Sequence, residues 1–153
     1  LGDVYKRQVL SYGGYNLYSP ALKGIFETRK NPFWTLALSK PRGIFGDNFN
    51  AQENPEMYKA ISPIYNIPNI DERKLPPQFI TSASEDRVTP VHAIEEYVKA
   101  LKDAGQEVTY WEYKDQRHAY LDSGKTFLSG NDFKRDAIPA LKKIMDFLNS
   151  KLL

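Results

Sequence analysis

The sequence predicts an α/β fold built on a parallel sheet, and two observations predict it. Residues 79–82 and 108–113 are short runs of apolar, aromatic and β-branched side chains, which is typical of strands. Between these runs, apolar residues recur at helical spacing: Val91, Ile94, Val98 and Leu101. A strand, a helix and a strand in this order form a crossover unit, whose two strands lie parallel.

The first element along the chain is the apolar run Val9–Tyr12, which predicts a strand that Gly13-Gly14 ends. Residues 1–8 resemble a peptide translated from sequencing-adapter DNA at the end of a metagenomic contig, so we set them aside as a non-native leader. A genuine polar N-terminus is the alternative. On either interpretation we expect a reading frame truncated at its front, with residues 9–153 forming the C-terminal part of one domain.

Residues 16–73 are divided into short pieces by six prolines. Asn54-Pro55 predicts the start of a helix that runs to Ile61, where Ser62-Pro63 ends it. Asn31-Pro32 predicts a second helix, which runs through Leu38.

The same stretch, 16–73, is also rich in aromatic residues, among them Phe33 and Trp34. One interpretation is a core packed by aromatic rings. The other is a lid or excursion that lines an acyl or aryl pocket, with Phe33 and Trp34 as candidate substrate-binding residues.

The ends of the two long helices are predicted from capping residues. Thr89 is expected to cap a helix whose first residue is Pro90, and Gly105 to end it as a left-handed cap. Asp136 is expected to cap the last helix, which would pack against the sheet. The predicted buried face of that helix consists of Ile138, Leu141, Met145, Leu148 and Leu152.

Composition limits the classes of function. The 153 residues include 21 Lys and Arg against 19 Asp and Glu, which leaves a net charge of +2. Without a basic run, neither nucleic acid nor an anionic membrane is an expected partner, and no apolar stretch approaches the ~18 residues of a membrane span. Cysteine is absent and His-Glu-x-x-His does not occur, so no metal site is expected. The compartment stays open between cytoplasmic and secreted.

Two polar residues follow the two strands of the crossover unit. Asp86 lies just beyond the first strand and His118 just beyond the second. The carboxyl ends of parallel strands meet at one edge of the sheet, where open α/β sheets place their sites. A carboxylate that orients a histidine makes up two members of an acyl-transfer triad. We therefore predict contact between Asp86 and His118, with Glu85 as the alternative acid.

Three segments carry a resemblance to a known family: Pro76–Asp86, Asp103-Ala104-Gly105 and Tyr113–Tyr120. Their pattern and spacing resemble the α/β-hydrolase fold, in particular its carboxylesterase and lipase branch. Serine peptidases of the prolyl-oligopeptidase type are the runner-up. The resemblance covers roughly residues 62–150. Three departures are Ala83 and Ala119, where the family usually has Gly, and Lys114-Asp115, where it usually has Pro-Gly.

The resemblance implies the C-terminal part of a mostly parallel α/β-hydrolase sheet flanked by helices. It also implies a serine hydrolase that cleaves carboxylic esters through an acyl-enzyme, without a cofactor. Asp86 would be the acid and His118 the base. Arg87 is a candidate substrate-binding residue, because an arginine near this place binds substrate in the peptidase branch. A small ester or a short peptide is the expected substrate.

The nucleophile is not found in the sequence. Gly-x-Ser-x-Gly is not met at any serine, so the nucleophile and the oxyanion hole are expected in a missing N-terminal half of the same domain. The chain alone is therefore predicted to be inactive. A prolyl-oligopeptidase-type peptidase and a non-catalytic hydrolase-fold receptor or interaction module remain as alternatives.

Overall fold

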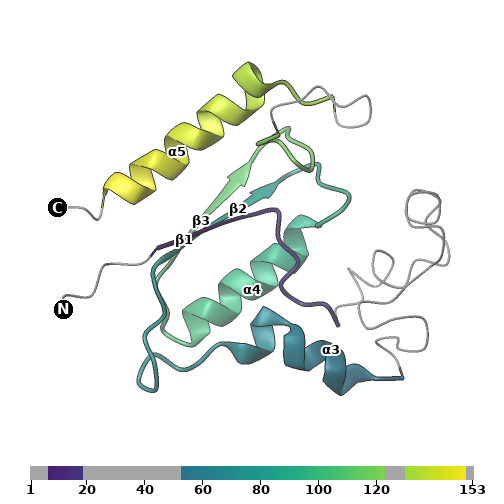
Figure 1. The fold of residues 1–153 in the computed structure, drawn as a ribbon, viewed down its shortest axis with the longest axis vertical. Coiled ribbons are helices and arrows are strands. Elements are labelled where there is room, and N and C mark those ends of the chain that lie inside the picture. The colour runs from purple at the N-terminus through teal and green to yellow at the C-terminus, as the bar shows by residue number, and fades with distance from the viewer. Residues whose placement is uncertain (1–6, 19–52, 123–129, 151–153) are drawn as a thin grey trace.

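A computed structural model describes residues 7–18, 53–122 and 130–150, and its three strands form one parallel sheet (Figure 1). The strands are β1 (Gln8–Ser11), β2 (Gln78–Ala83) and β3 (Val108–Tyr113), in the order β1-β2-β3. Both pairings are parallel, with Gln78 opposite Gln8 on one side and Val108 on the other. The predicted α/β class and all three predicted strands are confirmed within one residue at either end.

Helices cover both faces of the sheet, with α4 (Val91–Asp103) on one face and α5 (Ile138–Asn149) on the other (Figure 1). Strand β2 is buried along its whole length because it lies between two strands and two helical layers. Its residues alternate between the layers: Ile80 packs with Ile94 and Leu101 of α4, whereas Phe79 stacks on Phe147 of α5 at 5.2 Å between ring centroids.

The end of α4 confirms the predicted cap. Gly105 has a φ of +74°, a left-handed conformation that glycine adopts without strain. The N–H of Gly105 donates to the carbonyl of Lys102, and the N–H of Gln106 to that of Leu101, both at 2.9 Å. These two bonds satisfy carbonyls that the helix leaves open.

Gln106, the residue after this cap, is buried and ties the chain before β2 to the end of α4. Its amide oxygen accepts from the N–H of Leu75, and its amide nitrogen donates to the carbonyls of Pro68 and Arg73, each at 2.9 Å. One side chain thus satisfies three main-chain groups.

The predicted start of α4 is wrong by one residue. The helix begins at Val91, and Pro90 rather than Thr89 occupies the cap position. The hydroxyl of Thr89 donates instead to the carboxylate of Asp86 at 2.8 Å, so the threonine belongs to the loop that holds this acid.

The described part of the stretch 16–73 packs beneath α4. The predicted helix is confirmed as α3 (Pro55–Ile61), and the short helix η1 (Pro63–Asn66) follows it. Ser62 connects both to the chain after β1, because its hydroxyl accepts from the N–H of Leu17 at 2.9 Å. The helix predicted from Pro32 to Leu38, like Phe33 and Trp34, lies outside the described residues.

The start of the last helix differs from the prediction. Asp132, not Asp136, caps it by accepting from the N–H of Arg135 at 3.0 Å, and a π-helical turn (Phe133–Ala137) precedes α5. Asp136 is fully buried inside that turn, where its carboxylate accepts from the N–H of Asp132 and from the guanidinium of Arg135, each at 2.7 Å.

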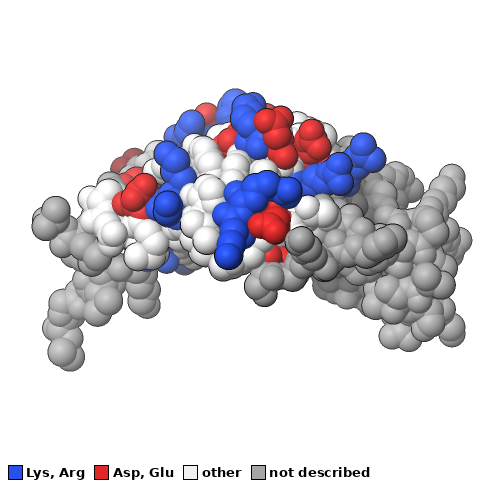
Figure 2. All heavy atoms as spheres, turned by 90° about the horizontal axis from the view of Figure 1, so that it is seen from above, with Lys and Arg blue, Asp and Glu red and all other residues white. Residues whose placement is uncertain are grey.

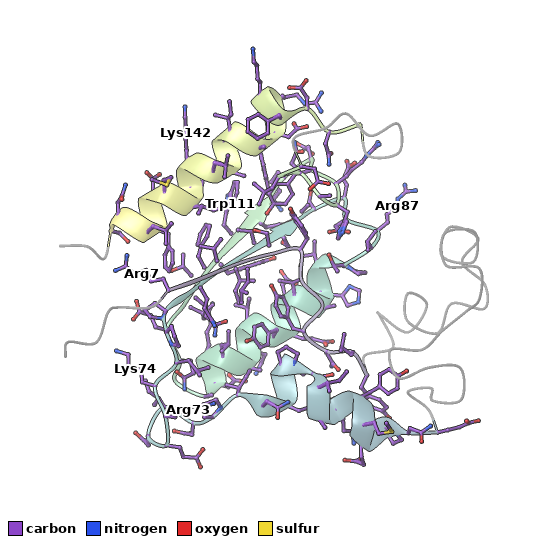
Figure 3. All side chains as sticks on the ribbon, viewed as in Figure 1. Arg7, Arg73, Lys74, Arg87, Trp111 and Lys142 are labelled. Atoms are coloured by element: carbon purple, nitrogen blue, oxygen red, sulfur yellow. The ribbon has the colours of Figure 1, made fainter. Side chains whose placement is uncertain are left out.

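The predicted buried face of α5 is also wrong. Ile138, Leu141 and Met145 are between 36% and 53% exposed, and the buried side chains are Ala140 and Phe147. Ala140 packs with Ala83 and Tyr120, since a small side chain lets the helix approach the sheet closely. The face over α5 presents acidic and basic side chains side by side (Figure 2), and Lys142 points away from the sheet (Figure 3). Leu152 lies outside the described residues.

Candidate active site

The loops after β2 and β3 leave the same edge of the sheet and are bonded to each other. Beyond the last paired residues, the N–H of Ser84 donates to the carbonyl of Tyr113 at 3.0 Å. The N–H of Glu85 then donates to the carbonyl of Gln116 at 2.8 Å. These bonds continue the strand pairing into the loops, so Asp86 and His118 emerge beside each other.

Asp86 and His118 form a hydrogen bond between Oδ2 and Nδ1 at 2.8 Å. The predicted contact is therefore confirmed. Because the carboxylate accepts, Nδ1 is the donor, and a neutral imidazole in this tautomer keeps the lone pair of Nε2. The histidine side chain is 33% exposed and the carboxylate side chain 0%. A substrate can thus reach the base, while the acid remains shielded from water.

The carboxylate of Asp86 accepts three further hydrogen bonds. The N–H groups of Val88 and Thr89 donate to Oδ1 at 2.7 and 2.8 Å, and the hydroxyl of Thr89 donates to Oδ2 at 2.8 Å. Burial by itself raises the pKa of Asp86, but the hydrogen bonds from His118 and Thr89 outweigh burial and lower it below the usual value. Asp86 is therefore held as an anion.

The loop of His118 is fixed at two further points. The amide of Asn131 donates to the carbonyl of His118 at 2.9 Å. Two residues after the histidine, the buried hydroxyl of Tyr120 bonds the hydroxyl of Thr81 in β2, which in turn donates to the hydroxyl of Ser11 in β1 at 3.0 Å. All three strands thus support this loop.

The two departures from glycine in this loop have a visible backbone consequence. Asp115 and Ala119 have φ values of 58° and 62°, which are left-handed backbone conformations that residues other than glycine adopt with strain. The glycines that the resembled family places here would relieve this strain.

The remaining predicted site residues lie around this pair or outside the described residues. Glu85 faces Arg117, with 3.7 Å between its carboxylate and the guanidinium, and both side chains are more than half exposed. Arg87 is exposed and its side chain extends away from the sheet (Figure 3). Hence Asp86, not Glu85, contacts the imidazole. Phe33 and Trp34 are not among the described residues.

Sequence reasoning did not assign Thr89, Asn131 or Tyr12 to the site. Thr89 was expected at a helix cap, and Asp86-x-x-Thr89 is itself the signal that would have placed it against the acid. Asn131 gives no such signal, because it reaches His118 from a loop 13 residues further on. In the described ranges, no cluster of His, Cys, Asp and Glu could hold a metal ion, and no helix is long and apolar enough to cross a membrane.

Comparison with known proteins identifies the family. The model of the prolyl oligopeptidase family, peptidase S9, matches residues 34–152. The chain belongs to the prolyl oligopeptidase family. No curated protein matches its sequence.

Solved structures of a peptidase and of esterases share the fold. An acylaminoacyl peptidase of Pyrococcus horikoshii is 23% identical with a TM-score of 0.63, over 99% of this chain and 21% of that one. The Est2 esterase of Thermogutta terrifontis is 17% identical with a TM-score of 0.52, over 92% and 42% of the two chains. A truncated carbohydrate esterase from gut microbiota is 18% identical with a TM-score of 0.54, over 73% and 35%.

These likenesses confirm the α/β-hydrolase fold that the sequence resembles. The chain spans about a fifth of the length of the peptidase, with 21% of that chain covered.

Proposed function

We propose that this chain supplies the acid and the base of a Ser-His-Asp triad in a serine hydrolase. The hydrogen bond of 2.8 Å between Asp86 Oδ2 and His118 Nδ1 carries the proposal. Membership of the prolyl oligopeptidase family supports it, because a serine peptidase needs this pair beside its nucleophile. The serine itself and the oxyanion hole would belong to an N-terminal half of the same domain.

From this geometry we assign each of the two residues a role. When the serine attacks the substrate carbonyl, Nε2 of His118 takes the proton of the serine hydroxyl. The ring is then an imidazolium, protonated at Nε2 and at the Nδ1 that faces Asp86. The anionic carboxylate stabilises this cation without taking its proton. The imidazolium then donates the proton to the leaving group, and an acyl-enzyme remains. Nε2 next takes a proton from a water that attacks this acyl-enzyme, and the imidazolium returns that proton to the serine oxygen as the carboxylic acid leaves.

Carboxylic esters are the substrate class we propose first. The esterases that share the fold support it, and Arg87, Phe33 and Trp34 are the candidate substrate contacts. Peptides are the second candidate. The family match favours them, as does an acylaminoacyl peptidase of the same fold whose structure is a complex with Z-Gly-Gly-Phe-chloromethyl ketone.

The deciding experiment begins with the reading frame upstream of this chain. A Gly-x-Ser-x-Gly there would supply the nucleophile, and its absence would favour a non-catalytic binding module.

The whole protein would then be assayed with a short-chain aryl ester and with an acylated peptide anilide. We expect His118→Ala to remove nearly all turnover, by ~10³-fold or more, with the circular dichroism spectrum unchanged. His92→Ala is the matched control, because His92 is exposed at the start of α4. Turnover that survives His118→Ala would reject the proposal.

The chain of 153 residues by itself is expected not to hydrolyse esters, because no serine in it has the context of a nucleophile elbow. The measurement is release of the aryl alcohol by residues 9–153 against buffer. Turnover that His118→Ala abolishes would show an unrecognised nucleophile within the chain.

A further inference from the structure

We infer that Tyr12 is a positioning residue that holds the imidazole of His118 in its working orientation, an inference that rests on the proposed function. Tyr12 lies just after β1, on a third loop at the same edge of the sheet. Its ring centroid lies 5.2 Å from that of His118, with an angle of 59° between the planes. The same ring meets Tyr120 edge-on at 5.2 Å. Tyr12 therefore packs against the base and against the residue that anchors the base's loop.

The main chain of Tyr12 reaches the other member of the pair. Its carbonyl lies 3.3 Å from the hydroxyl of Thr89, the group that donates to Asp86 Oδ2 at 2.8 Å. Its N–H donates to the carbonyl of Thr81 in β2 at 3.3 Å. One residue thus contacts the loop of the acid through its backbone and the loop of the base through its ring.

The backbone of Tyr12 is in an unfavourable conformation. Its φ is 41°, in the left-handed region that glycine favours, although Gly13 and Gly14 follow directly. Gly13 is needed where it is, because a Cβ there would lie 2.8 Å from the ring of Tyr15. A strained tyrosine at this edge is explained if its side chain is required there, since strain of this kind gathers at functional sites.

The role of Tyr12 follows from the freedom of orientation that the bond to Asp86 leaves to the imidazole ring of His118. The bond to Asp86 and the longer contact of 3.5 Å with the hydroxyl of Thr89 both meet the imidazole at Nδ1, so they fix one atom of it and the ring can still rotate about that atom. The aromatic ring of Tyr12 limits this swing on one side of the imidazole. The direction in which Nε2 points is then set before substrate binds, which is the kind of preorganisation that lowers the barrier of the chemical step.

The test uses nuclear magnetic resonance of the 153-residue chain with ¹⁵N-labelled histidine. The chain has two histidines, so exposed His92 serves as the internal reference for His118. In the unsubstituted chain we expect a nuclear Overhauser effect between the ring protons of Tyr12 and those of His118. We expect Tyr12→Leu to move the ring-proton shifts of His118 and to lower the fraction of its Nδ1-protonated tautomer. Tyr12→Phe, which keeps the ring, is expected to preserve both.

Two results would overturn the inference. One is the absence of the Overhauser effect in the unsubstituted chain, a measurement that does not depend on the folding of any variant. The other is a Tyr12→Leu chain whose His118 signals match those of the parent.

In the whole protein we expect Tyr12→Leu to lower kcat by about tenfold with KM nearly unchanged, and Tyr12→Phe to keep most activity. If the whole protein lacks hydrolase activity while Tyr12→Leu still moves the His118 signals, the proposed function fails and the placement of His118 by Tyr12 stands.

Discussion

Asp86→Asn changes the centre of the candidate site with almost no change of shape. The amide of the asparagine keeps one oxygen, which can still accept from the N–H groups of Val88 and Thr89. In place of Oδ2 it presents an NH₂ group to Nδ1 of His118, which now has to accept rather than donate. The proton of the imidazole then moves to Nε2, the atom that would act as the base.

The expected loss of stability follows from the four hydrogen bonds to the carboxylate. Bonds to a charged acceptor are worth ~1.5–3 kcal/mol and neutral ones ~1 kcal/mol, but the asparagine also avoids the cost of burying a charge. The pKa of Asp86 is lowered in the folded protein, so the balance favours the anion. We therefore expect the free energy of unfolding to fall by about 1–2 kcal/mol near neutral pH.

The pH dependence gives the sharper test. A carboxyl with a lowered folded pKa stabilises the fold above its unfolded pKa of ~3.9, and this stabilisation is lost as the pH falls through the folded pKa. Asparagine does not titrate. The difference in unfolding free energy between parent and Asp86→Asn should therefore be full above about pH 5 and shrink as the pH falls below ~4. Contributions from other acids, such as Asp136, are common to both chains and cancel in the difference.

The assay is urea unfolding followed by circular dichroism from pH 3 to pH 7, and Glu85→Gln is the matched control. The pair of Glu85 with Arg117 is exposed and 3.7 Å long, so its removal should cost under ~0.5 kcal/mol at any pH. If the whole protein is the proposed hydrolase, Asp86→Asn should lower its kcat by up to ~10⁴-fold and Glu85→Gln only slightly. A difference that does not vary with pH, or a larger loss for Glu85→Gln, would refute the assignment of Asp86.

Two further predictions concern stability and can be checked by thermal unfolding. Asp115→Gly and Ala119→Gly should each raise the free energy of unfolding by up to ~1 kcal/mol, because both residues have left-handed backbones; Ala100→Gly within α4 should lower it by about as much. Gln106→Leu should lower the free energy of unfolding by ~2–4 kcal/mol, since three partly buried main-chain groups lose their partner. Lys102→Ala on the exposed side of α4 should change it little, and equal losses for the two variants would contradict this account.

The strands and the contact between acid and base could be predicted because their signals are local. Each strand is a continuous run bounded by turn residues, and the crossover rule then places Asp86 and His118 at one edge. Prediction failed where two physical demands compete for one residue. Threonine is a typical capping residue, but the buried carboxylate of Asp86 is a stronger partner for the hydroxyl of Thr89 than the main-chain groups of a helix end.

The prediction of the buried face of α5 failed for a related reason. Two apolar stripes run along this helix, and hydrophobicity favours the one with the larger side chains. The structure buries the stripe with Ala140 and Phe147 instead, because Ala140 packs with Ala83 and Tyr120 and Phe147 stacks on Phe79. Tyr12 could not be assigned at all, since its role depends on a strand pairing that joins distant parts of the sequence.

The placement of Tyr12 directly after β1 also sets an order for folding. Asp86 and His118 are separated by 32 residues within one crossover unit, whereas Thr89 and Tyr12 are 77 residues apart. Short loops close at a smaller entropic cost, so the unit β2-α4-β3 is expected to form first and to hold the acid and base before β1 docks. During synthesis, β1 leaves the ribosome several seconds ahead of β2, its pairing partner, at ~5–20 residues per second. The strand that precedes Tyr12 is therefore synthesised early and paired late. During that interval its unpaired main-chain groups and apolar side chains need protection from contact with other chains.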